Sequence, residues 1–385
     1  YYLTTADWSS LGYEEDRRSY TWEKDHLVSL ATMHWLYPYR CIYYANIILD
    51  NIEKIERNKS NQMQWDNVKG QALFLRGRCF LSVASTWAKA YNEVTATTDP
   101  GIPLRTGSDF NAVSERASVK ETYERITMDL ALAVQLLPVN APHALRASKP
   151  AALALLARTY LFMRDYQNCF NYANECLQLK NELIDYNVLS KTDAYPFSQF
   201  NKEVLYASYL PAPEPLLNFK AKINPDLFNS YLTDDLRKIL FFVDNNDGSY
   251  GFKGSYDGSI LPFSGIAIDE VYLMRSECYA RAGKIKESMD DLNILLKCRW
   301  SNKSTYPMVS ATSTDEALAK ILKERRKELL MRGLRWPDIK RLNLENANIN
   351  LQRVVDNQTF TLPANDLRFA LPIPEDVIER TGMKQ

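Results

Sequence analysis

Apolar residues recur at helical spacing along most of the chain, and the pattern is clearest after residue 267. A first helix is predicted from Ile268 to a turn at Gly283, because apolar side chains three and four residues apart share one helix face. A second helix follows after almost no loop, and its apolar stripe comprises Ile285, Met289, Leu292, Leu295 and Leu296. Two amphipathic helices joined so closely are expected to lie antiparallel, as a helical hairpin.

A third helix is predicted to begin at Ser313 and to run to Arg332. The Ser313 hydroxyl can cap this helix while Glu316 reaches back, which is the arrangement of a capping box. Gly333 then supplies the left-handed residue that commonly ends a helix. Residue type and periodicity therefore predict the same boundaries.

The end of this third helix is crowded with charges of both signs. We interpret them as ion pairs one turn apart along a solvated helix face. The expected pairs are Lys320 with Glu324 and Glu328 with Arg332. After the helix, Trp336 stands directly before Pro337, a position that favours extended backbone. We expect the Trp336 ring to be a buried anchor.

The hairpin has a second copy at residues 149–180. The matched positions, which are 119 residues apart without a gap, are Ala157 and Ser276, Tyr160 and Tyr279, Phe170 and Met289, Ala173 and Leu292, and Leu177 and Leu296. Small residues fall at the expected helix crossing, and the length of the unit is close to that of tetratricopeptide repeats. The pattern predicts an all-α fold of stacked tetratricopeptide-like hairpins, with chance agreement between two unrelated hairpins as the alternative.

The rest of the pattern predicts a single domain, residues 1–385, with loop-rich parts attached to a helical scaffold. The scaffold is expected at about 24–180 and 268–342, a large irregular insertion at about 181–267, and a mostly extended C-terminal segment at 343–385. Further scaffold helices are predicted at about 24–57, 65–90 and 119–137. Loops on a rigid scaffold carry binding residues more often than the scaffold does, so the ligand face is expected in the loop-rich parts.

The charge balance restricts the class of partner. The chain carries 47 basic and 47 acidic residues, so its formal net charge is zero. No basic stripe of the kind that binds nucleic acid is present, and nucleic acid is not an expected partner. No apolar run is long enough to span a membrane. The six cysteines occur singly, without metal-type spacing, and are interpreted as small buried hydrophobes.

Aromatic residues make up 12% of the chain, which leaves more rings than a core needs. Sugar rings present apolar C–H faces and a rim of hydroxyls, so a glycan site needs flat aromatic rings beside planar polar groups. Residues 1–24, which show no periodicity and are expected to form a loop, offer both. The candidate ligand-binding residues there are Trp8, Tyr13, Arg17 and Trp22. The alternative is that these rings hold the loop on the scaffold.

The insertion offers a second group of candidate residues. Tyr250 and Tyr256 alternate with Gly and Asp, and glycine allows a ligand to approach the backbone. The alternative is a tight hairpin with exposed tyrosines. Apolar runs at 204–210 and 239–243 favour a small sheet, although residues 234–242 fit a helix equally well.

Metal sites and catalytic motifs have little support in the sequence. Three histidines are too few for a typical zinc site. The run from Val243 to Gly254 contains the middle of a calcium loop, but its first and last positions lack oxygen ligands. No G-x-S-x-G elbow, phosphate loop or G-x-G-x-x-G motif is present. We therefore expect no cofactor, no metal and no catalytic residue, although sequence alone does not show whether two carboxylates face each other as a glycosidase requires.

One segment resembles a family signature. The run Arg-Gly-Leu-Arg-Trp-Pro-Asp-Ile-Lys-Arg, within Glu324–Leu342, resembles the C-terminal signature of the SusD/RagB family of outer-membrane nutrient-binding lipoproteins. Four further segments are similar to other parts of that family, in the family's order: Gln71–Phe80, Gly101–Leu104, Ala147–Leu161 and Leu371–Ile378. The ordered set covers almost the whole chain, which makes the resemblance stronger than any single motif.

The resemblance implies a surface-exposed lipoprotein of the outer membrane, held by a lipid anchor upstream of Tyr1. It also implies a non-catalytic protein that binds oligosaccharides and delivers them to a TonB-dependent transporter of the SusC type. Peptide capture by the same architecture is one alternative. A helical-repeat adaptor for other proteins is a second, and a glycoside hydrolase is a third.

Overall fold

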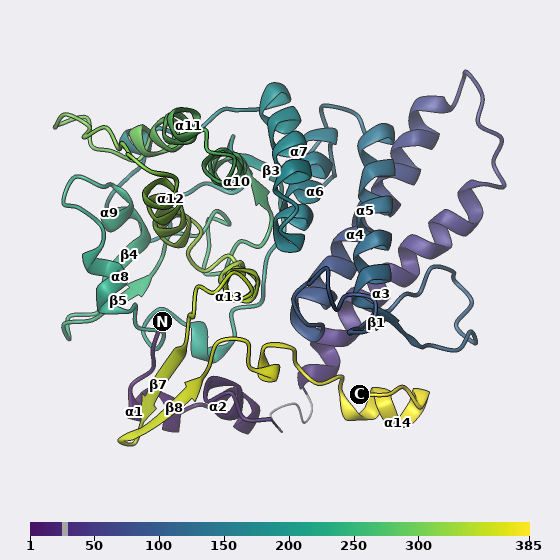
Figure 1. The fold of residues 1–385 in the computed structure, drawn as a ribbon, viewed down its shortest axis with the longest axis horizontal. Coiled ribbons are helices and arrows are strands. Elements are labelled where there is room, and N and C mark those ends of the chain that lie inside the picture. Colours follow the sequence, from purple (N-terminus) through teal and green to yellow (C-terminus); the bar gives the residue numbers. More distant parts are fainter. Residues whose placement is uncertain (25–29) are drawn as a thin grey trace.

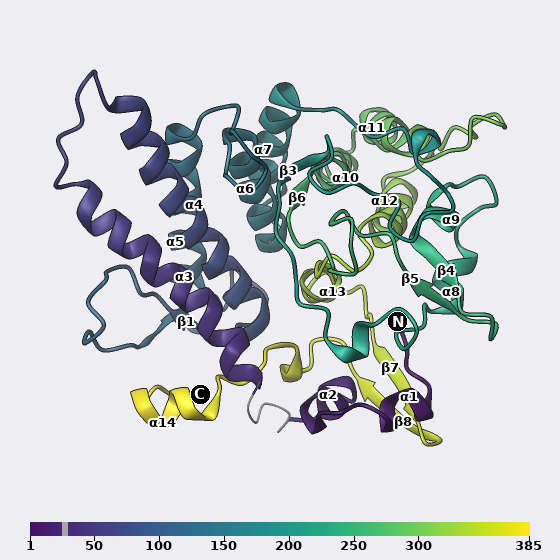
Figure 2. The same cartoon turned by 180° about the vertical axis from the view of Figure 1, so that it is seen from behind.

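The computed structural model describes residues 1–24 and 30–385, and its regular structure is mainly helical (Figure 1). The long helices are α3 (Leu30–Ile52), α4 (Gln62–Trp87), α5 (Val119–Leu136), α6 (Lys149–Met163), α7 (Tyr166–Leu179), α10 (Ile268–Arg281), α11 (Ile285–Lys297) and α12 (Thr314–Glu328). From α3 to α7 and on through α10 and α11 to α12, each of these helices packs against the next. Figure 2 shows this array from behind, with α3 at one end and α11 at the other. The predicted all-α fold of stacked hairpins is confirmed.

The α6–α7 hairpin shows how local residue choice sets these helices. The Ser148 hydroxyl accepts a hydrogen bond from the Ala151 N–H at the start of α6, and Pro150 occupies the first turn, where a missing N–H costs nothing. At the end of α6, Arg164 adopts a left-handed conformation, and Asp165 caps α7 by accepting from the Asn168 N–H. The turn is therefore only two residues long.

The second hairpin packs on the first through α7 and α10. The rings of Phe170 and Tyr279 meet edge to face with their centroids 4.9 Å apart. Ala157 and Ser276, the matched small residues, are fully buried, and the Ser276 hydroxyl donates to the Ser288 carbonyl at 2.7 Å. Both hairpins of the predicted repeat are present.

The N-terminal and C-terminal regions contain more regular structure than the periodicity predicted. Residues 1–24 contain α1 (Thr5–Ser9), which starts with a capping box between Thr4 and Asp7, and α2 (Glu14–Tyr20). Two short helices of this length show too few turns to give a periodic signal. The C-terminal segment contains β7 (Leu351–Val355) paired antiparallel with β8 (Gln358–Leu362), followed by α14 (Glu375–Thr381). The prediction of a loop was wrong at α1 and α2, while the mostly extended C-terminal segment departs from the prediction at the short helix α14.

Two expected helices end earlier in the structure, and the one predicted to run to Arg332 ends at Glu328. The helix predicted at 24–57 ends at Ile52, and part of its predicted beginning, residues 25–29, lies outside the described residues. The Ser313 cap is confirmed, because its hydroxyl accepts from the Glu316 N–H at 3.2 Å. The Glu316 carboxylate, however, accepts from the N–H and hydroxyl of Thr312.

The prediction for Trp336 was wrong in backbone conformation. Gly333 is left-handed as expected, with a φ of 72°, but Trp336 and Pro337 then form the first turn of a new helix, α13 (Arg335–Asn343). Proline is tolerated in a first turn, because the N–H groups there have no partner within the helix. The Trp336 ring is half-buried against Phe369, and its Nε1 donates to the Phe369 carbonyl at 3.1 Å.

The insertion folds around an apolar cluster of its own, which includes Phe197, Phe241 and Tyr256. Its elements are β3 (Val204–Tyr206), α8 (Pro225–Asn229), α9 (Arg237–Phe241), β4 (Phe242–Asp244), β5 (Tyr250–Phe252) and β6 (Ile266–Ala267). The strands pair as two short antiparallel ribbons, β3 with β6 and β4 with β5. Each of the two interpretations of residues 234–244 was therefore right in part, because α9 leads directly into β4.

The charges at the end of α12 are buried, so the predicted solvated face was wrong. Glu328 is 1% exposed and accepts from Arg237 Nη1 at 2.9 Å and from Arg299 Nε at 2.8 Å. Arg332 pairs with Asp269 at 2.7 Å. Glu328 and Arg332, which were expected to pair with each other, thus pair with residues of other elements, which periodicity along a single helix does not reveal.

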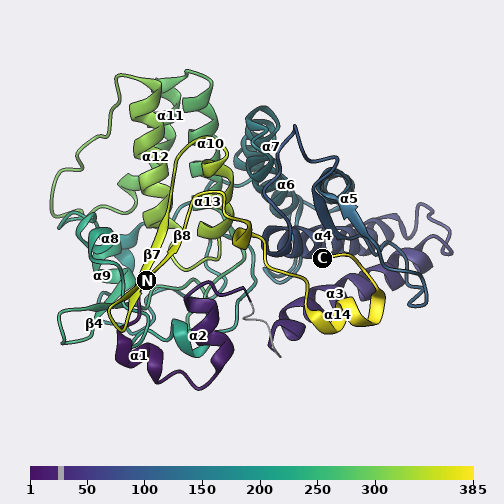
Figure 3. The ribbon, with the colours of Figure 1, turned by 60° about the horizontal axis from the view of Figure 1, so that its bottom comes forward.

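The loop-rich parts gather at one edge of the helical array. Figures 1 and 3 both show α1, α2 and the β7–β8 hairpin together at this edge, with α14 beside α3. A further short ribbon, β1 (Pro100–Pro103) with β2 (Arg116–Ser118), lies between α4 and α5 in the sequence. The scaffold therefore brings the first 24 residues and the C-terminal segment into one region.

Candidate functional site

The N-terminal segment meets the insertion along one stretch of backbone. Tyr2 forms an isolated antiparallel bridge with Lys222. The Gly12 N–H donates to Glu214 Oε2 at 2.8 Å, and Lys220 Nζ donates to the Ser10 hydroxyl at 2.9 Å. We call residues 8–17 together with residues 214–222 the junction surface. The two regions that were expected to carry ligand-binding residues are thus in direct contact.

On the N-terminal side of the junction surface, Tyr13 presents its ring to solvent and is 59% exposed. Trp8 is half-buried against an apolar cluster that includes Leu11, and its Nε1 donates to the Arg17 carbonyl at 3.1 Å. The Arg17 guanidinium donates to Glu14 and to the Leu11 carbonyl. The hydrogen bonds of Trp8 and Arg17 therefore stabilise the turn in which the Tyr13 ring is exposed.

On the insertion side, Phe219 is 58% exposed, and the sequence analysis missed it. Its neighbour Lys220 pairs with Glu214 at 2.5 Å. Hydrogen bonds from the Gly12 N–H and Lys220 lower the pKa of Glu214. The available signal was the proline-rich stretch at 211–215, because prolines are typical of turns and surface loops.

Two predicted site residues are in the core. Trp22 is 8% exposed, and the Arg353 guanidinium lies 4.5 Å from the centre of its ring. Tyr256 is 1% exposed, and its hydroxyl lies 2.9 Å from that of Tyr186 and 2.8 Å from Glu203 Oε2. Burial raises the pKa of Tyr256 well above its usual value. Neither ring face is open to a ligand in this structure, so the expectation for these two residues is corrected.

Tyr250 has an intermediate position. Its ring stacks on Phe228 with the centroids 3.7 Å apart and the planes 12° apart, so one face is already covered. Its carbonyl accepts from the Ile223 N–H at 2.7 Å, next to the junction surface. The adjacent Gly251 is required here, because a Cβ atom would lie 2.2 Å from the Asn218 carbonyl oxygen. Tyr250 therefore contacts the residue that follows the junction surface and helps to hold that surface in place.

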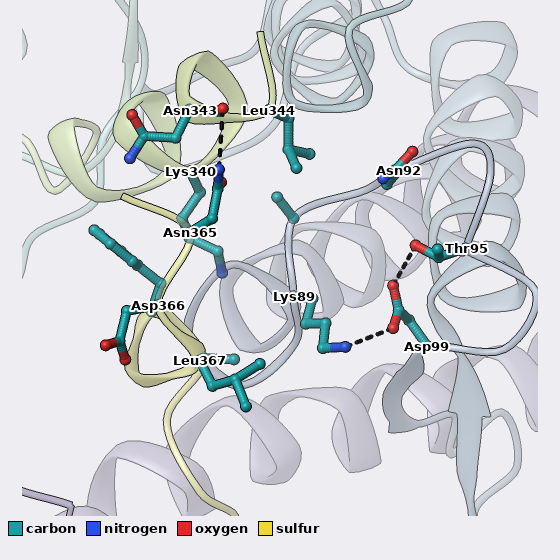
Figure 4. A pocket seen from close by; sticks show the side chains of 13 residues that line it. Lys89, Asn92, Thr95, Asp99, Lys340, Asn343, Leu344, Asn365, Asp366 and Leu367 are labelled. Carbon is teal, nitrogen blue, oxygen red and sulfur yellow. Dashed lines mark hydrogen bonds and ion pairs between the residues drawn. The ribbon is translucent and has the colours of Figure 1, made fainter. Parts of the chain in front are cut away.

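A separate pocket of about 240 Å³ lies between the segment that follows α4, the end of α13 and residues 365–370 (Figure 4). We call it the polar pocket. Its lining includes Lys89, Asn92, Thr95, Asp99, Lys340, Asn343, Leu344, Asn365, Asp366, Leu367 and Phe369. Lys89 and Thr95 both bind Asp99, at 2.7 and 2.6 Å. The sequence analysis missed this site, because its residues come from segments without periodicity that are far apart in the chain.

A third concavity of about 270 Å³ lies between α3, the β1–β2 loop and the C-terminal residues around α14. Trp35, Tyr39, Tyr43 and Phe110 contribute rings to it. Asn46 is buried beside it and donates to the Arg105 and Gly107 carbonyls. Its most exposed ring, Phe110, projects from a loop.

Within the described residues, no cluster of three or more histidine, cysteine, aspartate or glutamate side chains is arranged to hold a metal ion. The calcium-like run forms the turn between β4 and β5, where Asp247 accepts from the N–H and hydroxyl of Ser249. Among the helices described, none has both the length and the apolar character needed to cross a membrane.

Comparison with known families gives a match in each half of the chain. A family model described as starch-binding and associating with the outer membrane matches residues 5–161. The model of the SusD family matches residues 268–383. No curated protein matches the chain.

Solved structures extend the likeness over almost the full length. A putative sugar-binding protein from Bacteroides vulgatus has a TM-score of 0.77 at 21% identity, covering 96% of this chain and 88% of its own. A SusD superfamily protein from Bacteroides thetaiotaomicron has a TM-score of 0.72 at 24% identity, covering 91% and 84%. A SusD-like carbohydrate-binding protein from B. vulgatus has a TM-score of 0.67 at 22% identity, covering 91% and 82%.

The protein is thus a helical-repeat protein that carries a loop-rich edge on stacked hairpins. The matched models, taken with the shared fold, place it in a particular family. The chain belongs to the SusD/RagB family.

Proposed function

We propose that this protein captures oligosaccharides at the cell surface without cleaving them and delivers them to a TonB-dependent transporter of the SusC type. The observation that carries the proposal is the junction surface. There Tyr13 and Phe219 present exposed rings from two segments that the hydrogen bond between Gly12 and Glu214 ties together.

The chemistry of the junction surface suits a sugar chain. Exposed rings can stack on the apolar C–H faces of successive sugar units, and a ring with only one or two rotatable bonds loses little entropy when it does so. Glu214 and Lys220 add charged hydrogen-bonding groups to the same surface, and such groups can bind sugar hydroxyls. Because these groups are already paired, they are held in position before the ligand arrives.

Localisation and partner are proposed on family grounds. The family description associates its members with the outer membrane, and two of the structural relatives are described as sugar-binding or carbohydrate-binding. We place the protein on the outer face of that membrane, with a lipid anchor upstream of Tyr1 and a SusC-like transporter as its partner. Co-purification with a transporter encoded beside it would support this part of the proposal.

The proposal is tested by affinity electrophoresis against plant, starch-type, microbial and host glycans. Tyr13→Ala and Phe219→Ala are expected to weaken binding of the retained glycan at least tenfold each, because each removes one stacking ring. Tyr44→Ala is the matched control, since this ring is 58% exposed but lies on α3. A reducing-sugar assay on the same mixtures is expected to show no release.

The alternatives predict different results. Release of reducing sugar would favour a hydrolase. Binding of peptides in calorimetry, with no glycan retained, would favour peptide capture. Binding that is equally strong in the parent, Tyr13→Ala and Phe219→Ala proteins would move the glycan site away from the junction surface.

A further inference from the structure

Lys340 sits in the wall of the polar pocket, and no acid among the described residues compensates its charge. The side chain belongs to α13, is 6% exposed, and donates from Nζ to the Ser85 carbonyl at 2.9 Å and the Ala88 carbonyl at 2.6 Å. These carbonyls lie at the end of α4, where the helix has no partner of its own for them. An ammonium group has three N–H donors. Two are used, and within the described part of the chain no carboxylate forms an ion pair with Lys340.

The other charges of the polar pocket are already neutralised. Lys89 pairs with Asp99 at 2.7 Å, and Asp366 pairs with Arg368 at 2.9 Å. On α13 itself, Arg341 pairs with Glu277 and Asp338. Lys340 therefore leaves one positive charge in a desolvated site, and burial lowers its pKa to about 7. An anion bound in the pocket would compensate the positive charge of Lys340.

The remaining lining favours a small hydroxylated ring. A volume of about 240 Å³ is below the roughly 300–1,000 Å³ of pockets that enclose drug-sized ligands, so the space suits a single ring. Phe369, Leu344 and Ala370 supply apolar surface, while Asn92 and Asn365 supply amide groups. In Figure 4, Lys340 lies beside Asn365, across the pocket from Asn92.

We propose that the polar pocket binds an acidic sugar unit of the captured oligosaccharide, with the sugar carboxylate accepting the free N–H of Lys340. The amides of Asn92 and Asn365 take ring hydroxyls, and the apolar wall takes a C–H face. This inference rests on the proposed function and names its ligand class. The pocket is a second binding site, distinct from the junction surface.

The test compares an oligogalacturonide of three units with its methyl ester by isothermal titration calorimetry. The acid is expected to bind at least tenfold tighter than the ester, because only the acid carries the anion that compensates Lys340. Lys340→Met is expected to abolish this preference. Because that change also removes two helix-end hydrogen bonds, a second variant leaves Lys340 intact. Leu367→Trp, at a rim residue that is 73% exposed, is expected to block the pocket and weaken binding of the acid at least tenfold.

The pH dependence supplies an independent measurement. Because the bound carboxylate favours the charged ammonium, binding of the acid is expected to take up a proton at pH 8 and to weaken as the pH rises from 6 to 8. The other charged groups around the pocket, Lys89, Asp99, Asp366 and Arg368, each keep a partner in this structure. Proton uptake that persists in Lys340→Met would contradict the assignment.

Failure of this inference can be told apart from failure of the proposed function. If acid and ester bind equally, or if Leu367→Trp leaves the affinity for the acid unchanged, the acidic-sugar site is wrong. The proposed function then stands as long as glycan binding still depends on Tyr13. If neither oligogalacturonide binds but another glycan of the panel does, only the acidic-sugar site is wrong. If no glycan of the panel binds the parent protein, both are wrong.

Discussion

The two ends of the helical array are held together by different interactions. Around α5, α6 and α7 the interior is largely apolar, and residues such as Leu153 and Leu156 are fully buried. The buried pair of Arg76 with Asp129 is an exception there. Around α9, α10, α12 and α13, buried guanidinium groups and carboxylates fill much of the interior, and Arg299 with Glu328 is one of many such pairs. We call these the apolar half and the charged half.

The comparison shows that one fold can be stabilised both by apolar packing, which is sensitive to side-chain shape, and by buried ion pairs, which are sensitive to pH. Apolar burial depends on shape and hardly on pH, whereas a buried ion pair depends on both partners remaining charged. Removing one member of a buried pair leaves the other charge uncompensated, which is more costly than losing the attraction itself. Substitutions and changes of pH should therefore lower the stability of the two halves to different extents.

The largest effect is expected from Glu328→Gln in the charged half. This change removes the charge that faces both Arg237 and Arg299 while keeping the side-chain shape. We expect the free energy of unfolding to fall by about 3–5 kcal/mol, the usual cost of breaking a buried pair from one side. Urea denaturation followed by circular dichroism measures it. A loss below about 1 kcal/mol would show that the pair is solvated and would erase the contrast between the halves.

A somewhat smaller effect is expected from Leu156→Ala in the apolar half. Leu156 is fully buried in α6, so the change leaves a cavity and costs about 3 kcal/mol. The same loss is expected at pH 7 and at pH 5, because no titrating group changes. If the loss varied strongly with pH, the cavity would disturb the buried pair of Arg158 with Glu270, which joins α6 to α10.

Acidification should weaken the charged half selectively. Burial alone would raise the pKa of Asp338, but the guanidinium groups of Arg325 and Arg341 outweigh it and lower the pKa. The pKa of Glu277 is likewise lowered, because Arg341 outweighs the effect of burial. A carboxyl group whose pKa is lower in the folded than in the unfolded state stabilises the fold above the unfolded pKa. That contribution is lost as the pH falls through the folded value.

The measurement is the stability difference between the parent and Glu277→Gln. The difference is expected to be largest near pH 7 and to shrink below about pH 5, as the parent loses the contribution of its charged carboxylate. The loss caused by Leu156→Ala at the same pH values is the control. A Glu277→Gln difference that grows on acidification would mean that the sign of the pKa shift is wrong.

The smallest effect is expected from Lys320→Gln. Lys320 pairs with Glu316 one turn away on α12, but both side chains are more than one-third exposed. Water and salt screen such a pair, so no resolvable change in the melting temperature is expected. A clear drop would show that exposed and buried pairs on α12 contribute alike.

The same comparison explains how much the sequence could predict. In the apolar half, stripes such as the one along α7 predicted helices and hairpins, because burial there follows the helical period. In the charged half, Glu328 looked solvated, since a buried and an exposed glutamate are the same letter and the partners Arg237 and Arg299 lie far away in the sequence. The spacing of residues along a helix predicts only pairs between residues that are close in the sequence.

The candidate site shows the same limit. Tyr13 was predicted from its aromatic and polar neighbours, and its ring is exposed in the structure, although its role as a ligand-binding residue stays a prediction. Trp22 looked equivalent and is buried, because it packs in a cluster with Ile339, Leu362 and Phe369, which are distant in the sequence. Phe219 carried only the weak signal of the proline-rich stretch before it. Lys340 carried no local signal, because its hydrogen-bond partners Ser85 and Ala88 are more than 250 residues away in the chain.

The pairs that join the insertion to α11 and α12 also constrain how the chain folds. Arg299 reaches Glu203 across 96 residues, and Arg237 reaches Glu328 across 91. Closing loops of this length costs entropy before any contact repays it, whereas α3 to α7 form largely from neighbours in sequence. We therefore expect the helices between residues 30 and 180 to condense while the rest of the chain is still being synthesised. The insertion and the last helices then become ordered together and late, which makes this half the slow step on the way to the native state.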